Sequence, residues 1–399
     1  MKIAIYNDWW APQLVGGAER TALDLALKLA QEFGPENINI FTPSNSSNSS
    51  FEIRDDLRVS RLKSNTWRSD YSIGLFRKIF EKIRIVFDQK FVSLVIDEVL
   101  SSEASLLILH NIDRLGLSFV ERFRAKSQIP IIRIQHDLGD SCIYRTRMQK
   151  ITKSNCSNTC ISCKFKENIF RNQSKNYDTM ISVSKFVEST YQRLGFSPIE
   201  SFVGYPNHEN VNIEAGRYFF CNSNNIRLGF IGRVVPEKGI ESVLHAMAII
   251  KTDYKKNVSL YICGTGSERY LRKLEKIASR IKVELNHLGA SSDPYNLLAD
   301  KIDAVVVPSI WQEPLGRVPM ECVSRGIPCF VSNIGGLIES REWLGGPIIF
   351  YESSNSLDLA AKITLALEEG IEVLDSPKSY SNLNEIIIRE CKKFASRGL

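Results

Sequence analysis

The sequence has no long hydrophobic run: none of its segments reaches the roughly 18–20 uncharged apolar residues that a membrane-spanning helix requires. Its N-terminus lacks a signal-peptide cleavage pattern, so we expect a cytoplasmic protein. It also lacks a block of lysine and arginine, and a net charge of +6 with a pI near 8.7 favours anionic small molecules or an anionic membrane surface over nucleic acid. Nine cysteines, an odd number, argue against a disulfide framework.

What the sequence does contain is a repeated alternation of apolar runs and helical patterns, over a length that predicts more than one domain. This alternation is typical of parallel sheets covered by helices on both faces. A Ser/Asn-rich tract at 44–50 predicts a loop. The predicted strands lie at 2–6, 38–42, 106–109, 131–134, 180–183, 226–231, 259–263, 284–288, 304–308, 329–331 and 348–351.

Turn residues and an Asn- and Ser-rich stretch separate two such patterns near residue 205. We therefore expect an α/β protein of two doubly wound domains, an N-terminal one at 1–205 with a cysteine-rich insertion at 142–163, and a C-terminal one at 206–380. Residues 381–399 predict a terminal helix that packs back across the domains.

A pair of cations follows one predicted strand of the second domain. Gly232 and Arg233 come directly after the strand, and Lys238 precedes a predicted helix. Doubly wound sheets bind ligands at the carboxyl ends of their strands. A helix N-terminus also favours anions, so this segment suits a diphosphate. By themselves, these residues are equally compatible with two solvated surface cations.

Two glutamates stand eight positions apart after another predicted strand. Glu313 lies on a loop and Glu321 near the start of the next helix, with Leu315 and Gly316 between them. Both carboxylates can face one cleft, where they would accept hydrogen bonds from sugar hydroxyls while backbone N–H groups contact oxygens of the same ligand. Taken alone, ordinary surface glutamates explain this spacing better.

Two glycine turns complete the pattern, one at 263–267 that contains Gly264 and one at 332–339. Each alone is a weak signal, because α/β folds need such turns. The order of all four segments resembles the donor domain of glycosyltransferase family 4, which belongs to the GT-B superfamily and to the glycosyl transferases group 1. Residues 16–19 resemble the Gly-Gly-x-Glu loop of this family, and residues 135–137 resemble its His-Asp segment.

The resemblance implies a GT-B fold, with two facing Rossmann-like domains and a cleft between them. It implies that Arg233 and Lys238 bind the diphosphate of a nucleoside-diphosphate sugar. Glu313 then contacts the transferred sugar, and Glu321 binds the ribose hydroxyls. The other implied donor-binding positions are Gly16, Gly17, Gly232, Gly264, Leu315 and Gly316. His136 would lie near the sugar or the acceptor, although a histidine after a strand also occurs as a structural residue.

The implied reaction is sugar transfer with retention of anomeric configuration to a glycan or lipid-linked acceptor, in polysaccharide or lipopolysaccharide synthesis. No Asp-x-Asp pair occurs in the sequence, which suits a site where arginine and lysine neutralise the leaving group without a divalent metal. The alternative is a catalytically silent sugar-nucleotide-binding or scaffolding protein with this fold.

Two further segments leave alternatives open. Cys142, Cys156, Cys160 and Cys163 have a spacing similar to that of a zinc knuckle, so they predict a structural zinc site, with free thiols or a disulfide as alternatives. Residues 76–100 mix cations with large apolar side chains at helical spacing. That segment would rest on an anionic membrane as part of a peripheral association, or pack as an ordinary helix with a solvated cationic face.

Overall fold

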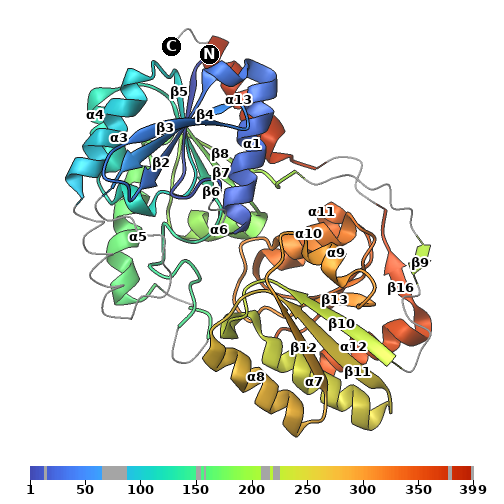
Figure 1. Cartoon of the computed structure of the whole chain (residues 1–399). Helices are drawn as coiled ribbons and strands as arrows, with labels where there is room; N and C mark the ends of the chain where they lie inside the picture. The colour runs from blue at the N-terminus through green and yellow to red at the C-terminus, as the bar shows by residue number, and fades with distance from the viewer. Residues whose placement is uncertain are drawn as a thin grey trace. The chain divides into compact units, whose positions relative to one another are not determined.

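The computed structural model describes residues 1–12, 16–64, 88–149, 154–156, 159–207, 216–218, 225–375 and 380–396. They belong to two compact units, each with its own parallel sheet (Figure 1). Unit 1 comprises Met1–Arg145, Asn158–Asn207 and Ser381–Leu399, and unit 2 comprises Thr146–Ser157 and His208–Tyr380. The predicted α/β class with two doubly wound sheets is confirmed.

The sheet of unit 1 has eight strands in the order β3-β4-β2-β1-β5-β6-β7-β8. Its central strands are continuous apolar runs because helices cover both faces, so that every residue of β1 and β5 is buried. All neighbouring strands pair in parallel except β3 and β4, which form an antiparallel hairpin at one edge. The strands are β1 (Ile3–Tyr6), β2 (Ile38–Ser44), β3 (Ser50–Arg54), β4 (Leu57–Lys63), β5 (Leu106–Leu109), β6 (Ile131–Gln135), β7 (Thr179–Ser182) and β8 (Glu200–Val203).

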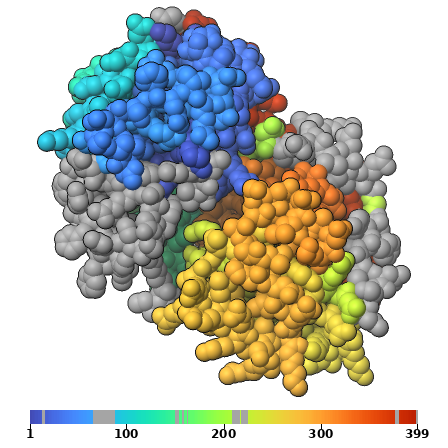
Figure 2. All heavy atoms as spheres, viewed as in Figure 1, coloured from blue at the N-terminus to red at the C-terminus, as the bar shows by residue number. Residues whose placement is uncertain are grey.

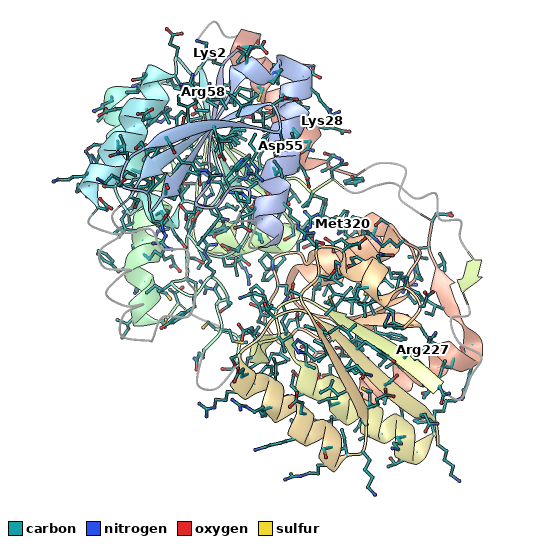
Figure 3. All side chains as sticks on the ribbon, viewed as in Figure 1. Lys2, Lys28, Asp55, Arg58, Arg227 and Met320 are labelled. Carbon is teal, nitrogen blue, oxygen red and sulfur yellow. The ribbon has the colours of Figure 1, made fainter. Side chains whose placement is uncertain are left out.

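The helices of unit 1 bury one apolar face each. In α1, Ala22, Leu25 and Leu29 are inaccessible to solvent, whereas Lys28 on the opposite face is exposed (Figure 3). The helices are α1 (Gly17–Phe33), α3 (Gln89–Ser101), α4 (Phe119–Lys126), α5 (Ile161–Ser174), α6 (Lys185–Arg193) and α13 (Leu383–Ser396).

The terminal helix α13 packs on unit 1. It contacts the same core as α1, although the two helices lie at opposite ends of the sequence. Leu383, Ile387 and Cys391 are fully buried in the same apolar core as the residues of α1. Atoms of α13, coloured red, reach the surface beside the blue atoms of α1 in the space-filling view (Figure 2). Lys393 adds ion pairs to Glu200 on β8 and, at 3.1 Å, to Glu390.

The sheet of unit 2 has six parallel strands in the order β12-β11-β10-β13-β14-β15. A separate antiparallel pair joins β9 (Gly216–Tyr218) to β16 (Ile371–Val373). The strands of the main sheet are β10 (Asn225–Ile231), β11 (Asn257–Cys263), β12 (Glu284–Gly289), β13 (Ala304–Val307), β14 (Cys329–Ser332) and β15 (Ile348–Tyr351). The helices are α7 (Ile240–Asp253), α8 (Glu268–Arg280), α9 (Pro294–Leu298), α10 (Arg317–Val323), α11 (Ser340–Leu344) and α12 (Ser356–Glu369).

Each sheet has one point at which the strand order changes direction. In unit 1 the chain builds β2 and β4 on one side of β1 and β5 to β8 on the other, so this switch lies between β1 and β5. In unit 2 it lies between β10 and β13. Ligands of doubly wound sheets bind outside the carboxyl ends of the strands at such a switch. The loops after these four strands are therefore the first places to look for a site.

The structure differs from the sequence prediction at the edges of the sheets. The hairpin β3–β4 was not predicted, because its edge strand β3 exposes Phe51 and Ile53 and so has no buried run. The Ser/Asn-rich tract is the connection between β2 and β3, as its composition predicted. Among the helices that the structure describes, none is both long and apolar enough to cross a bilayer.

Candidate functional site

The loop after β10 lies against the end of β13. The chain passes from Arg233 through a short 3-10 turn (Pro236–Lys238) and enters α7 after Gly239. Gly239 has a positive φ of 69°, and a Cβ atom there would lie 1.9 Å from the carbonyl oxygen of Pro308, so only glycine fits this close approach. A hydrogen bond of 3.1 Å from the Ile310 amide to the Glu237 carbonyl joins the two loops further.

This contact brings together a cation and a carboxylate that the sequence analysis had assigned to one site. Lys238 Nζ lies 2.6 Å from Glu313 Oε1, with 19% and 6% of the two side chains exposed. The Ser309 hydroxyl also donates to Glu313 Oε1, and the Lys238 ammonium lies 6.0 Å from the centre of the Trp311 ring. Arg233, on the same loop as Lys238, is exposed.

The backbone around Glu313 is held by the turn that follows β14. The Gly336 amide donates to the Glu313 carbonyl oxygen at 2.7 Å. Leu315 is 5% exposed, and Gly316 precedes α10 with a positive φ of 83°. The glycine pair at 335–336 therefore supports the loop that carries Glu313.

Glu321 lies on α10 and has both carboxylate oxygens engaged. The Tyr295 hydroxyl donates to Oε2 at 3.0 Å and Arg317 Nε donates to Oε1 at 3.2 Å. The neighbouring Met320, labelled in Figure 3, is 3% exposed, so this part of α10 is buried. The guanidinium of Arg325 covers the Tyr295 ring at 4.4 Å, so the tyrosine is itself held in place.

Gly264 joins the turn after β11 to the loop after β10. Its φ is 159°, and a Cβ atom there would lie 1.8 Å from the Gly232 carbonyl oxygen. Backbone hydrogen bonds from Gly232 to Cys263 at 3.0 Å and from Val234 to Thr265 at 2.7 Å hold the two turns together. Gly232 and Gly264 thus act as a pair that allows the turns to approach.

In unit 1, the glycine loop after β1 leads directly into α1. Gly16 is exposed and precedes the helix, of which Gly17 is the first residue. Glu19, in the first turn, is 6% exposed and accepts a hydrogen bond of 3.1 Å from Asn111, which follows β5. Burial raises the pKa of Glu19 above its usual value.

His136 follows β6 and pairs with another histidine. His110 Nδ1 and His136 Nε2 are 2.8 Å apart, and the rings are stacked at an interplanar angle of 16°. His110 is fully buried, whereas His136 is partly exposed. Burial and the charge of Arg133 lower the pKa of His110 to about 3, so this imidazole is neutral.

An ion-pair network surrounds the same strand ends. Arg145 lies 2.8 Å from Asp113 and 3.1 Å from Asp137, and Lys166 lies 2.8 Å from Asp113. Asp8, after β1, is buried and accepts from the Tyr6 hydroxyl at 3.0 Å. Burial and the charge of Asp113 raise the pKa of Asp8 to about 7. Polar groups from three loops thus converge at the switch of unit 1.

Of the four cysteines predicted to bind zinc, the structure brings the side chains of Cys142 and Cys160 to that of Cys163, and Cys142 and Cys163 form the buried pair. Their sulfur atoms are 3.9 Å apart and both side chains are 4% exposed. Cys156 belongs to unit 2, whereas Cys142, Cys160 and Cys163 belong to unit 1. Within the described ranges, no group of three or more His, Cys, Asp or Glu side chains is arranged to hold a metal ion. Zinc binding therefore stays a prediction from spacing.

The basic segment at 76–100 is described only from residue 88 onward, and residues 76–87 lie outside the described residues. In the described part, α3 buries Phe91, Val92 and Val95 in unit 1. This part therefore packs as an ordinary core helix.

The residues of these sites that were not identified from the sequence include His110, Tyr295, Ser309 and Arg317, as well as the members of the ion-pair network in unit 1. His110 and Ser309 come directly after predicted strands, a position that could have singled them out. Tyr295 contacts Glu321 from a different helix, and Arg317 contacts it from one turn earlier in the same helix. Only the folded chain shows these contacts.

Comparisons with known proteins concern the family of one segment and the fold of the chain. Residues 220–385 match the family model described as glycosyl transferases group 1. A protein in the cps region of Klebsiella pneumoniae is 28% identical over 214 residues, which are 53% of this chain and 51% of that protein. A glycosyltransferase of Methanocaldococcus jannaschii is 34% identical over 148 residues, 36% of each chain. The chain therefore spans about half the length, or less, of these curated relatives.

The crystal structure of Anabaena HepE in complex with UDP-glucose superimposes with a TM-score of 0.60 at 17% identity, over 92% of this chain and 90% of the other. This likeness concerns the fold. Residues 220–385 thus carry a similarity to the glycosyl transferases group 1, and the chain has the two-domain GT-B fold.

Proposed function

We propose that this protein is a retaining glycosyltransferase of family 4 that moves a sugar from a nucleoside-diphosphate sugar to a hydroxyl of a glycan or lipid-linked acceptor. The observation that carries the proposal is the Lys238–Glu313 pair at the switch point of unit 2, with Arg233 on the same loop. The family model covers the segment that contains these three residues. Donor binding is therefore assigned to unit 2.

The residues of unit 2 suit the separate parts of such a donor. Arg233 and Lys238 supply two positive charges for the diphosphate, and Glu313 offers a carboxylate to the hydroxyls of the sugar. Glu321, held by Tyr295 and Arg317, offers its oxygens to the ribose hydroxyls. Because Gly232 and Gly264 have no side chains, the phosphates could approach the backbone of these two turns closely.

The proposed reaction breaks the bond between the anomeric carbon and the phosphate oxygen. The acceptor hydroxyl forms the new bond on the same face of the sugar, and its proton passes to the departing phosphate oxygen. Negative charge grows on the diphosphate as it leaves, so Arg233 and Lys238 stabilise the transition state more than the ground state. No step in this scheme requires a divalent metal.

The known relatives favour particular substrates for a first test. The Anabaena structure holds UDP-glucose, and the Klebsiella relative lies in a cps region. We therefore propose a UDP-sugar as the donor and cell-surface polysaccharide or lipopolysaccharide synthesis as the setting. Gly16, Gly17 and His136 of unit 1 would then contact the donor phosphates and the transferred sugar or acceptor.

The alternative is a protein that binds sugar nucleotides without catalysis. The two functions differ in turnover, because only an enzyme releases nucleoside diphosphate from the donor in the presence of an acceptor or water. A thermal-shift screen against nucleoside diphosphates and their sugars identifies the ligand first, since a ligand of the folded state raises apparent stability.

With the donor identified, Arg233→Ala and Lys238→Ala should each lower turnover by roughly 10²–10³-fold, the effect of losing one preorganised electrostatic stabiliser. Arg272→Ala is the matched control, because Arg272 lies on α8, is 67% exposed and forms a surface ion pair with Glu268. Turnover near the wild-type level in Arg233→Ala and Glu313→Ala would place the site elsewhere.

Two auxiliary proposals accompany this function. If the cysteine cluster binds zinc, the purified protein should contain about one metal ion per chain, and this metal should be lost when Cys160 and Cys163 become serine. Wild-type protein that is folded, active and free of metal would refute this proposal. Peripheral membrane association through 76–100 predicts flotation with anionic liposomes that weakens when Arg77, Lys78, Lys82 and Arg84 become serine. Equal flotation of both proteins would refute that proposal.

A further inference from the structure

The histidine pair arises from two adjacent strands that run in parallel. His110 comes directly after β5 and His136 directly after β6, and the two strands pair through Leu109 and Arg133. Their side chains therefore meet at the same edge of the sheet, with 2.8 Å between His110 Nδ1 and His136 Nε2. A contact of this length between ring nitrogens requires one N–H and one lone pair.

The surroundings of His110 keep this ring neutral. It is fully buried, and Arg133, 5% exposed, donates from its guanidinium to the His110 carbonyl oxygen. Arg133 is in turn paired with Asp140 at 2.8 Å, so its charge is fixed next to the ring. With a pKa lowered to about 3, His110 carries a single ring proton near neutral pH.

The position of that proton follows from the other nitrogen. His110 Nε2 is buried and has no hydrogen-bond partner in the part of the chain that the structure describes. A proton on Nε2 would leave a buried N–H donor unpaired, which folded proteins rarely tolerate. A proton on Nδ1 instead enters the contact with His136 and leaves Nε2 as an unpaired acceptor, the milder defect.

We propose that His110 donates its Nδ1–H to His136 Nε2 and thereby holds His136 in the neutral tautomer that carries its proton on Nδ1. His110 is then a positioning residue. Resting on the proposed function, this limits the role of His136: its Nε2 accepts the hydrogen bond from His110, so His136 does not act as a base through Nε2 on the bound sugar or on the hydroxyl that attacks it.

The direct test is ¹⁵N NMR of the ligand-free, full-length protein labelled at histidine. The chain has five histidines, so single substitutions assign each signal. We expect His110 and His136 both to carry their proton on Nδ1 near neutral pH. A proton on Nε2 of either ring would overturn the proposal.

Two substitutions then test the dependence of one ring on the other. Leucine at position 110 cannot donate, whereas the amide of asparagine places an N–H near the position of Nδ1. We expect His110→Leu to shift the His136 tautomer signals and to lower turnover about tenfold without changing donor KM, as for loss of one neutral hydrogen bond. His110→Asn should retain most of both properties.

His245→Gln is the control, because His245 is exposed on α7 in unit 2. Unchanged His136 signals in His110→Leu would refute the proposal. The tautomers are measured without ligand. A wrong tautomer prediction can therefore be distinguished from a wrong proposed function. If the protein has the expected tautomers but binds no sugar nucleotide, the proposed glycosyltransferase function is refuted and the tautomer assignment of the histidine pair still holds.

Discussion

Removal of Lys238 should destabilise unit 2 as well as abolish transfer. Glu313 is only 6% exposed and lies 2.6 Å from Lys238 Nζ. In Lys238→Met the Glu313 carboxylate stays buried and keeps the hydrogen bond from the Ser309 hydroxyl, but it loses its cation. Breaking a buried pair by removing one partner costs about 3–5 kcal/mol. Because Lys238 is 19% exposed and partly screened by water, we expect a loss of roughly 2–3 kcal/mol.

The two partners should not be equivalent. In Glu313→Gln the lysine side chain can turn toward solvent, so this change should cost less, about 1 kcal/mol. The double variant Lys238→Met/Glu313→Gln removes both charges and should be more stable than Lys238→Met alone. All three variants should lack normal turnover, because the double variant restores charge balance and not the ligand contacts.

Thermal unfolding followed by calorimetry measures this series. A loss of 2–3 kcal/mol predicts a fall of roughly 4–12 °C in the transition of a domain of this size. The two units can unfold separately, so the transition of unit 2 is identified by its shift with added nucleoside diphosphate. If the effects of the two single changes simply add in the double variant, the groups do not interact and the reasoning is refuted.

Three further predictions use other contacts. Tyr295→Phe removes the donor to Glu321 Oε2 and should weaken nucleoside diphosphate binding about fivefold by calorimetry; unchanged affinity would contradict this role. Since the pKa of His110 is 6.5 in the unfolded chain and about 3 when folded, its contribution to the free energy of unfolding is complete above pH 6.5 and lost toward pH 3. Urea titrations of His110→Asn should lack that acid loss, and an identical pH profile would refute it. Ile387→Ala, at a fully buried position of α13, should cost about 2–5 kcal/mol, against near zero for the exposed Glu385→Ala; equal stability would mean that α13 does not complete the core.

The sequence predicted the parallel strands and the loops at their carboxyl ends well, because a buried strand needs a continuous apolar run and a tight turn needs glycine. Both requirements are local. The predicted runs at 106–109 and 348–351 coincide with β5 and β15. The hairpin β3–β4 was missed because an exposed edge strand has no such requirement, and Phe51 and Ile53 stand in solvent.

Partners between distant segments could not be predicted in the same way. Lys238 and Glu313 were assigned to one site from their order along the chain, but their contact depends on Gly239 and Pro308 meeting at the switch point. His110 lies 26 positions from His136, and nothing in the composition of either segment distinguishes a ring contact from two separate histidines. Such pairs follow from strand order, which a single sequence does not specify.

The two units share one physical arrangement at their switch points. In each, polar side chains from loops after neighbouring strands are bonded to one another: Lys238 to Glu313 in unit 2, and His110 to His136 in unit 1. A group held in this way does not have to be ordered when the ligand arrives. In the proposed reaction the diphosphate would share Lys238 with Glu313, so the attraction between Lys238 and the bound donor would be weaker than for an unpaired lysine. The same lysine would then stabilise the charge that develops on the leaving phosphate, and this would be the differential stabilisation that catalysis of sugar transfer requires.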